Sequence, residues 1–234
     1  MAQIDYFSNT GASITTSSTS KTSPSKKWIS DDVTSFDGLV KAKTPKPATF
    51  ALMDTNQTSA THGKVNLNLD DFYGAEKSPN NNGVTLTKLP PLLYPTANNI
   101  KAIQAHASER FQDMLKDFNI PYAPEKITFD NSGKMVIPDN YPYKNQLQEA
   151  INQTPGLERE MRDLNALSSH YAALQSLEVV HAEISNAKND WEVGEILKKY
   201  KGVIEKASQG FNMALKFTPN GELSITADGQ GLKL

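Results

Sequence analysis

Two short stretches of this chain follow the same pattern, and most of its helical pattern lies between them. Residues 127–137 and 215–225 match at five positions, which are Ile or Leu, Phe, Gly, Met or Leu, and Ile. Each stretch places apolar residues two apart, then a turn that contains Gly133 or Gly221, then apolar residues two apart again. This pattern predicts a β-hairpin with one buried face. A hairpin at each end of a helical region favours an α+β domain.

Helical spacing of apolar residues dominates the rest of the C-terminal part. Thr96 is expected to N-cap a helix whose apolar residues run from Ile100 to Phe118. A short helix is expected around residues 144–151. The predicted fold class is therefore α+β, with helices packed on a small antiparallel sheet that is built from the two similar hairpins.

One predicted helix is much longer than the others. Thr154-Pro155 combines an N-cap side chain with a proline at the first helical position, and the apolar pattern then continues to about residue 187. We therefore expect one long amphipathic helix over about 155–187. Asn189, with Glu192 three residues later, predicts a separate helix over about 191–200.

The first part of the chain has a different composition. Thirteen of the first 30 residues are Ser or Thr, and Pro45 and Pro47 interrupt any regular pattern. We expect residues 1–83 to form a largely irregular arm and residues 84–234 to form the α+β domain. Short strands are predicted at 65–69 and 84–89. The alternative left open is an arm that is ordered against the domain or against a partner.

Charge and residue usage argue against several classes of protein. The chain has 24 basic and 26 acidic residues. Such a balanced surface gives no field to attract a phosphate backbone, so we expect no nucleic-acid partner. The chain has no cysteine, which excludes disulfides, thiolate metal sites and a Cys nucleophile.

From the sequence we expect no membrane span and no cleaved signal peptide. No apolar run approaches the roughly 20 residues that cross a bilayer. The N-terminus lacks the basic residue and the apolar core of a secretory signal. The localisation therefore stays open between the cytoplasm and export without a cleaved signal peptide.

The histidines are the first place to look for a metal site. His170 and His181 share a face of the long predicted helix, but they stand about 16 Å apart, which is too far to bind one ion. His62 and His106 have no supporting partner in the sequence pattern. We therefore predict no metal site and no cofactor.

No catalytic motif is apparent either. The sequence has no G-x-S-x-G elbow and no glycine-rich phosphate loop. Glu158 with Arg162, and Arg159 with Asp163, show the i,i+4 spacing of surface ion pairs. Residues 130–133 resemble a calcium loop only superficially, because no Glu stands at position twelve, and a hairpin turn is the better account. No catalytic residue is predicted.

One loop has the composition of a contact surface. Tyr141 and Tyr143, with Pro138 and Pro142, follow the first predicted hairpin. Tyrosine is favoured at interfaces because it brings a large contact area and a hydrogen bond at low entropy cost. Tyr141 and Tyr143 are therefore candidate partner contacts. The alternative is a plug that packs the loop on the sheet.

Five short segments from Leu89 onward carry a resemblance to other proteins. They are 89–96 (LPPLLYPT), 129–133 (FDNSG), 138–143 (PDNYPY), 164–170 (LNALSSH) and 226–229 (TADG). With them, about 140 residues of the chain resemble a recurrent set of bacterial proteins to which no activity is assigned. The resemblance implies a bacterial source and a single C-terminal domain. It implies no activity, cofactor or catalytic residue.

Three functional hypotheses follow. The first is a non-enzymatic bacterial interaction or assembly protein, which would bind a protein partner or a second copy through the exposed face of the long helix and through Tyr141 and Tyr143. The second is a substrate of a bacterial export system that reads no cleaved signal, because Ser/Thr-rich N-termini are common among such substrates. The third is an enzyme with a dispersed site, for which His170, Glu160 and Tyr141 would be tested first.

Overall fold

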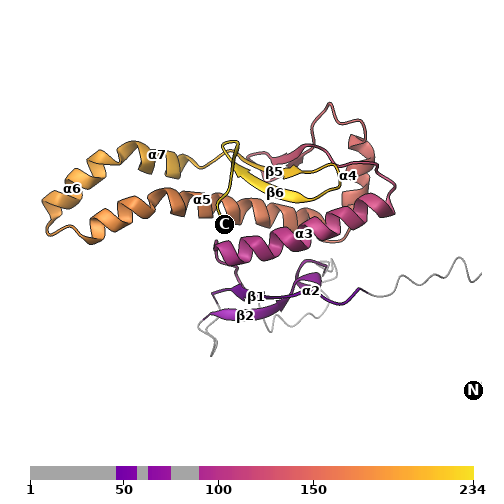
Figure 1. Ribbon diagram of the computed structural model, residues 1–234, viewed down its shortest axis with the longest axis horizontal. Coiled ribbons are helices and arrows are strands. Elements are labelled where there is room, and N and C mark those ends of the chain that lie inside the picture. The colour runs from indigo at the N-terminus through magenta and orange to yellow at the C-terminus, as the bar shows by residue number, and fades with distance from the viewer. Residues whose placement is uncertain (1–45, 57–62, 75–89) are drawn as a thin grey trace, which may run out of the picture. The chain divides into compact units, whose positions relative to one another are not determined.

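The structure is a computed structural model that describes residues 46–56, 63–74 and 90–234 (Figure 1). Residues Pro47–Leu234 belong to one compact unit. The described residues of this unit contain six helices and two antiparallel sheets. The predicted α+β class is therefore confirmed.

Each repeated stretch forms a β-hairpin, and the two hairpins lie side by side in one sheet. The first strands of the two hairpins pair antiparallel, with Ile127 opposite Leu215. These two residues occupy the first matched position of each stretch, so a local two-fold axis relates the hairpins. The sheet has the order β4-β3-β5-β6-β7. Its strands are β3 (Lys126–Phe129), β4 (Met135–Val136), β5 (Met213–Phe217), β6 (Leu223–Ala227) and β7 (Gln230–Gly231).

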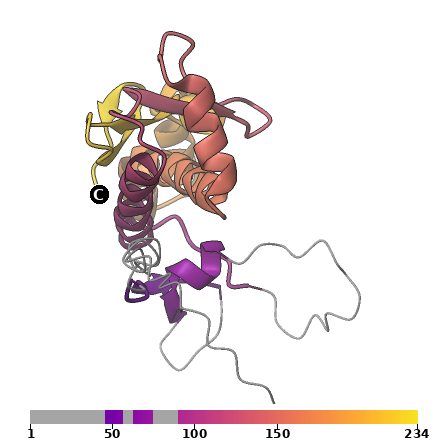
Figure 2. The same ribbon diagram turned by 90° about the vertical axis from the view of Figure 1, so that its right-hand side faces the viewer.

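Two long helices form the middle layer of this unit. α3 (Ala97–Asp117) and α5 (Leu157–Ser185) contact each other, and both pack against the five-stranded sheet. On their other side lies a small sheet of β1 (Phe50–Asp54) and β2 (Lys64–Asn68), followed by the short α2 (Leu69–Gly74) (Figures 1 and 2). The short α4 (Lys144–Gln153) follows the first hairpin and contacts α3 and α5.

The core extends over both faces of the middle layer. On the side of the large sheet, the ring of Phe111 in α3 stacks on the ring of Phe217 in β5, with centroids 4.3 Å apart. On the side of the small sheet, Met53, Leu69 and Tyr73 have no exposed surface. Part of the stretch that the sequence placed in an irregular arm is therefore folded against the helices. Residues 1–45 and the strand expected at 84–89 lie outside the described residues.

The second half of α5 forms a helical hairpin with α6 (Asp190–Lys199) and α7 (Lys201–Gln209), which run back along it. Figure 1 shows this hairpin extending beyond the sheet. The side chain of Asn189 accepts the backbone N–H of Glu192, so the predicted N-cap of α6 is confirmed. The sequence did not predict α7, which contains Gly202, a residue of low helix propensity.

The two other predicted helix starts have different outcomes. Thr96 caps α3 as predicted, since its side chain accepts the backbone N–H of Asn99. Thr154 does not cap α5. Its hydroxyl donates to the carbonyl oxygen of Ala150 at the end of α4, and Gly156 is the residue that precedes α5.

Candidate functional site

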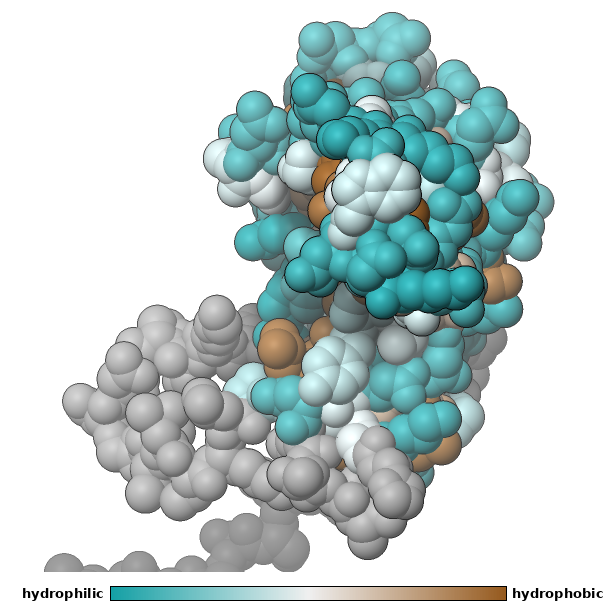
Figure 3. Space-filling model, turned by 90° about the vertical axis from the view of Figure 1, so that its left-hand side faces the viewer, coloured by the Kyte–Doolittle hydropathy of each residue, from teal (hydrophilic) through white to brown (hydrophobic). Residues whose placement is uncertain are grey.

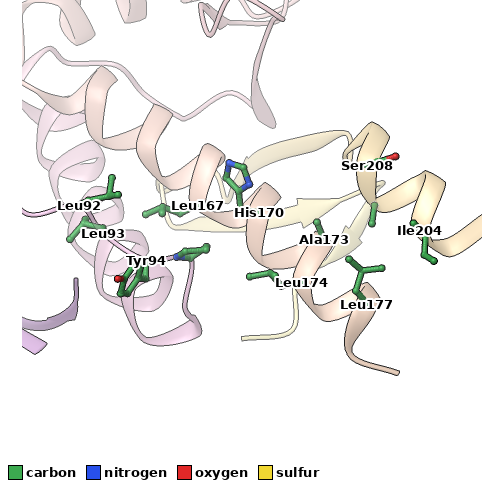
Figure 4. A pocket seen from close by; sticks show the side chains of 12 residues that line it. Leu92, Leu93, Tyr94, Leu167, His170, Ala173, Leu174, Leu177, Ile204 and Ser208 are labelled. Atoms are coloured by element: carbon green, nitrogen blue, oxygen red, sulfur yellow. The ribbon is translucent and has the colours of Figure 1, made fainter. Parts of the chain in front are cut away.

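An open groove with an apolar lining follows α5. It has a volume of about 580 Å³. The segment before α3, with Leu92, Leu93 and Tyr94, forms one wall, and α7 with Ile204 forms the other (Figure 4). α5 runs between the two walls. We call this feature the α5 groove.

The α5 groove exists because one stripe of α5 is incompletely covered. Leu167, His170, Leu174 and Leu177 line the groove at steps of three, four and three residues, so they share one face of the helix. Leu174 is 53% exposed, and Leu92 on the wall is 63% exposed. Contiguous exposed apolar surface of this kind marks sites of association.

The wall of residues 92–94 is hydrogen-bonded to β1. The backbone N–H of Tyr94 donates to the carbonyl oxygen of Asp54 at 3.0 Å, and that of Asn56 donates to the carbonyl oxygen of Leu92 at 3.1 Å. The buried side-chain amide of Asn99, in α3, donates to the carbonyl oxygens of both Asp54 and Tyr94. The small sheet, the wall and the start of α3 therefore form one hydrogen-bonded unit.

A cluster of charged side chains is buried where α2, α3 and α5 meet. His106 lies between two carboxylates: its Nδ1 is 2.5 Å from Oε1 of Glu160, and its Nε2 is 3.2 Å from Oδ1 of Asp70. Arg110, one turn further along α3, donates to Oε2 of Glu160 at 2.7 Å. The Glu160 side chain is 0% exposed, whereas that of Asp70 is 45% exposed. We call this group the His106 cluster.

This geometry favours a charged imidazole. A neutral imidazole has one N–H donor and one acceptor nitrogen, so it can donate to only one of two carboxylates. Burial lowers the pKa of His106. Hydrogen bonds and charge from Glu160 and Asp70 raise it by a larger amount, so the net pKa lies above the ordinary value. Burial raises the pKa of Asp70, while the Thr49 N–H and His106 lower it, and the net pKa lies below the ordinary value.

Tyr73 of α2 covers one side of the cluster. Its ring stacks on the His106 ring with centroids 6.4 Å apart. The guanidinium of Arg159 lies 5.3 Å from the centre of the Tyr73 ring and donates to the carbonyl oxygen of Phe72. Burial, together with the carboxylates of Asp163 and Glu160, raises the pKa of the Tyr73 hydroxyl far above its usual range. The hydroxyl therefore stays neutral.

The His106 cluster corrects one interpretation of the sequence. His106 was assigned no supporting partner, and this interpretation is wrong, because Glu160 and Asp70 both contact its ring. The partners of His106 are 36 and 54 residues away along the chain, so no local motif connects them. A signal was nevertheless present. Glu160 falls on the apolar face of its helix with Leu157 and Leu164, where a carboxylate needs a buried partner.

The three residues that the enzyme hypothesis would test first lie in different parts of the structure. His170 lines the α5 groove, Glu160 belongs to the His106 cluster, and Tyr141 belongs to the hydrophobic core. None of the contacts that these three side chains make in the described residues joins them to one another. They therefore do not form the nucleophile, base and orienting group that catalysis by proximity requires.

Tyr141 and Tyr143 pack with Tyr122. The three rings contact one another edge to face, with centroids 5.3 to 5.9 Å apart. Tyr141 is 7% exposed, and its hydroxyl donates to the carbonyl oxygen of Tyr122 at 2.5 Å. Tyr143 is partly buried against the core. These contacts give both tyrosines a packing role, and partner binding by them stays a prediction.

The calcium-like stretch is a hairpin turn. Oδ1 of Asp130 accepts the backbone N–H groups of Ser132 and Lys134 at 2.9 Å each. Over residues 46–56, 63–74 and 90–234, no group of three His, Asp or Glu side chains is arranged to bind a metal ion. Over the same ranges, no helix combines the length and the apolarity that crossing a membrane demands.

No family model, no curated protein and no solved structure matches this chain. The resemblance to a recurrent set of bacterial proteins therefore stays a prediction. The α5 groove and the His106 cluster have to be interpreted from their own geometry.

Proposed function

We propose that this protein is a non-enzymatic bacterial assembly protein that associates with a second copy of itself through the α5 groove. The open apolar groove, with Leu92 and Leu174 exposed at its surface, is the observation that carries the proposal. Removing apolar surface from water is the main favourable term in protein association. Fully burying an exposed leucine side chain contributes about 1.5–3 kcal/mol, and these two leucines, which are already partly covered, would each contribute part of that.

The side chains that line the groove are better suited to apolar packing against a partner than to catalysis. Among its described residues, the polar side-chain groups are those of Tyr94, His170 and Ser208. The carboxylates and guanidinium groups of the His106 cluster do not line it. A surface of this composition supports a contact that excludes water.

A second copy is the occupant that the surface favours. A two-fold interface uses the same patch on both copies, and this patch offers both a hollow and exposed leucines that can enter the hollow of the other copy. The net charge of the chain is −2, so two copies repel each other only weakly. By contrast, the end of the molecule that carries α6 is mostly hydrophilic, with small separate hydrophobic patches (Figure 3).

The size of the groove sets the expected affinity. Twelve residues line it, whereas a standard interface has about 20–30 residues on each side. We therefore expect a weak dimer, with a dissociation constant of about 1–100 μM.

Light scattering coupled to gel filtration tests this proposal with two matched variants. Leu174→Glu places a charge in the groove. Val179→Glu places the same charge on the same helix, at a position that is 56% exposed and is not part of the lining. We expect the wild-type protein and Val179→Glu to dimerise with the same affinity, and Leu174→Glu to dimerise at least about tenfold more weakly.

Two results would reject the proposal. A wild-type protein that stays monomeric up to about 1 mM would show that a second copy is not the occupant of the groove. A dimer that both substitutions weaken equally, or that neither weakens, would show that the contact lies elsewhere.

A further inference from the structure

We propose that His106 is a proton-operated latch on the α5 groove. When both ring nitrogens are protonated, His106 of α3 binds Asp70 of α2 and Glu160 of α5. These contacts stabilise the wall of residues 92–94, which is hydrogen-bonded to β1. When the ring loses one proton, the contact with Asp70 is lost and the wall becomes less stable. This inference rests on the proposed function, because it describes the regulation of the same groove.

The first step of the argument is the position of the ring between two elements. Glu160 approaches Nδ1 from α5 and Asp70 approaches Nε2 from α2. When the ring is neutral, the lone pair of one nitrogen faces a carboxylate, and that contact becomes repulsive. Glu160 keeps Arg110 as a second partner and is fully buried. Asp70 is partly exposed and can be hydrated, so the contact to Asp70 is the one that is lost.

The second step is that the neighbouring groups do not titrate in the same range. The cations beside the cluster, on Arg110 of α3 and Arg159 of α5, are guanidinium groups, a type of side chain that stays protonated in proteins. The Tyr73 hydroxyl of α2 stays neutral because burial, with Asp163 and Glu160, holds its pKa far above the usual range. Around neutral pH, the ring of His106 is therefore the group whose charge changes.

The third step connects Asp70 to the groove. Its Oδ2 accepts the backbone N–H of Thr49 at 2.7 Å, immediately before β1. At its other end β1 holds the wall, through the hydrogen bonds that Asp54 and Asn56 make with residues 92–94. α2 also follows directly on β2, which pairs with β1 over its whole length. Loosening α2 therefore loosens the support of the wall.

The direction of the pH effect follows from the pKa shifts. The pKa of His106 is raised on folding, so the latch contributes fully below its ordinary pKa of 6.5 and is lost as the pH rises through the folded value. The pKa of Asp70 is lowered, so its contribution is present above its ordinary pKa of 3.8 and is lost as the pH falls through the folded value. The latch is closed between these limits and opens on the alkaline side.

Hydrogen exchange of two backbone amides measures the latch directly. The amides of Asn56 and Tyr94 bridge β1 and the wall. Their protection factors are measured from about pH 6 to about pH 9, with correction for the intrinsic exchange rates. The measurement uses the Leu174→Glu protein at a concentration where light scattering shows a monomer, so that self-association does not contribute. Amides in the middle of α3 serve as an internal reference.

We expect the protection of the Asn56 and Tyr94 amides to fall with rising pH, because the protonated ring of His106 binds Asp70 more strongly than the neutral ring does. The midpoint should coincide with the titration of the His106 ring seen by NMR. Asp70→Asn should lower the pKa of His106 and remove most of the pH dependence. Asp71→Asn, which changes the neighbouring carboxylate of α2, should leave both unchanged.

Either of two results would overturn the latch. One is protection at Asn56 and Tyr94 that does not depend on pH. The other is an equal loss of protection in α3, which would show unfolding of the whole domain. Both are measured on a protein that light scattering has shown to be monomeric, so they are independent of whether the wild-type protein dimerises.

Discussion

At the scale of single residues, Gly156 shows how a distant contact decides a local structure. It precedes α5 with a backbone φ of 72°. A Cβ added to it would lie 1.6 Å from the carbonyl oxygen of Tyr73. Only glycine combines this close approach with a positive φ at low cost. The helix start expected at Thr154 is therefore shifted by a contact with a residue 83 positions earlier in the chain, which the local sequence does not show.

Gly156→Ala should lower the free energy of unfolding by at least about 3 kcal/mol, because backbone strain and a clash with backbone atoms add together. Gly229→Ala, in the tight turn between β6 and β7, is the matched control. Gly229 also has a positive φ, 82°, but an added Cβ there would meet nothing within 4 Å. We expect that control to lose only about 1–2 kcal/mol. Urea denaturation measures both, and equal losses would contradict the role of Tyr73.

At the scale of elements, the two halves of α5 have different environments. Leu157, Met161 and Leu164 in the first half have no exposed surface. In the helical hairpin, neither α6 nor α7 contributes a buried side chain. Glu183 of α5 accepts hydrogen bonds from the Lys199 ammonium at 2.8 Å and from the Tyr200 hydroxyl at 2.6 Å. The hairpin is therefore held by half-buried contacts and by polar pairs at the surface.

We expect the amides of α6 and α7 to exchange faster than those in the first half of α5, because fewer buried contacts have to open. Glu183→Gln should accelerate exchange in α6 and α7 and leave the first half of α5 unchanged. Glu178→Gln, an exposed carboxylate one turn earlier on the same helix, is the control. Equal protection of α7 and of the first half of α5 would disprove this account.

At the scale of the whole molecule, the folded unit begins earlier than the composition of the chain suggests. The small sheet and α2 supply Met53, Leu69 and Tyr73 to the core. The boundary expected at residue 84 lies in the range 75–89, outside the described residues. The export hypothesis depends on the first 30 residues. These also lie outside the described residues, so the hypothesis stays a prediction.

A chain that begins at Pro47 should unfold with the same cooperativity as the full chain, whereas one that begins at Val84 should not fold stably. The shorter chain lacks three buried side chains, each worth about 1.5–3 kcal/mol. That loss is comparable with the whole stability of a typical domain, about 5–15 kcal/mol. Thermal unfolding followed by circular dichroism compares the two. A cooperative transition at the same temperature in both would show that the small sheet is dispensable.

Local interactions account for what the sequence determined by itself. The alternation of 127–137 and 215–225 predicted both hairpins, Thr96 and Asn189 predicted two helix starts, and helical spacing predicted α3, α4, α5 and α6. These features depend on residues within a few positions of one another, so their physics is contained in a short window.

Only the tertiary structure decided what those faces contact. Periodicity places Glu160 and His106 on the buried faces of two helices, but their pairing depends on chain segments 54 residues apart. The same holds for the α5 groove, which is left open because α7 and residues 92–94 cover α5 on either side of the stripe. A helix specifies its apolar face through its own sequence. Which neighbour covers that face, and how completely, is set by the packing of the whole chain.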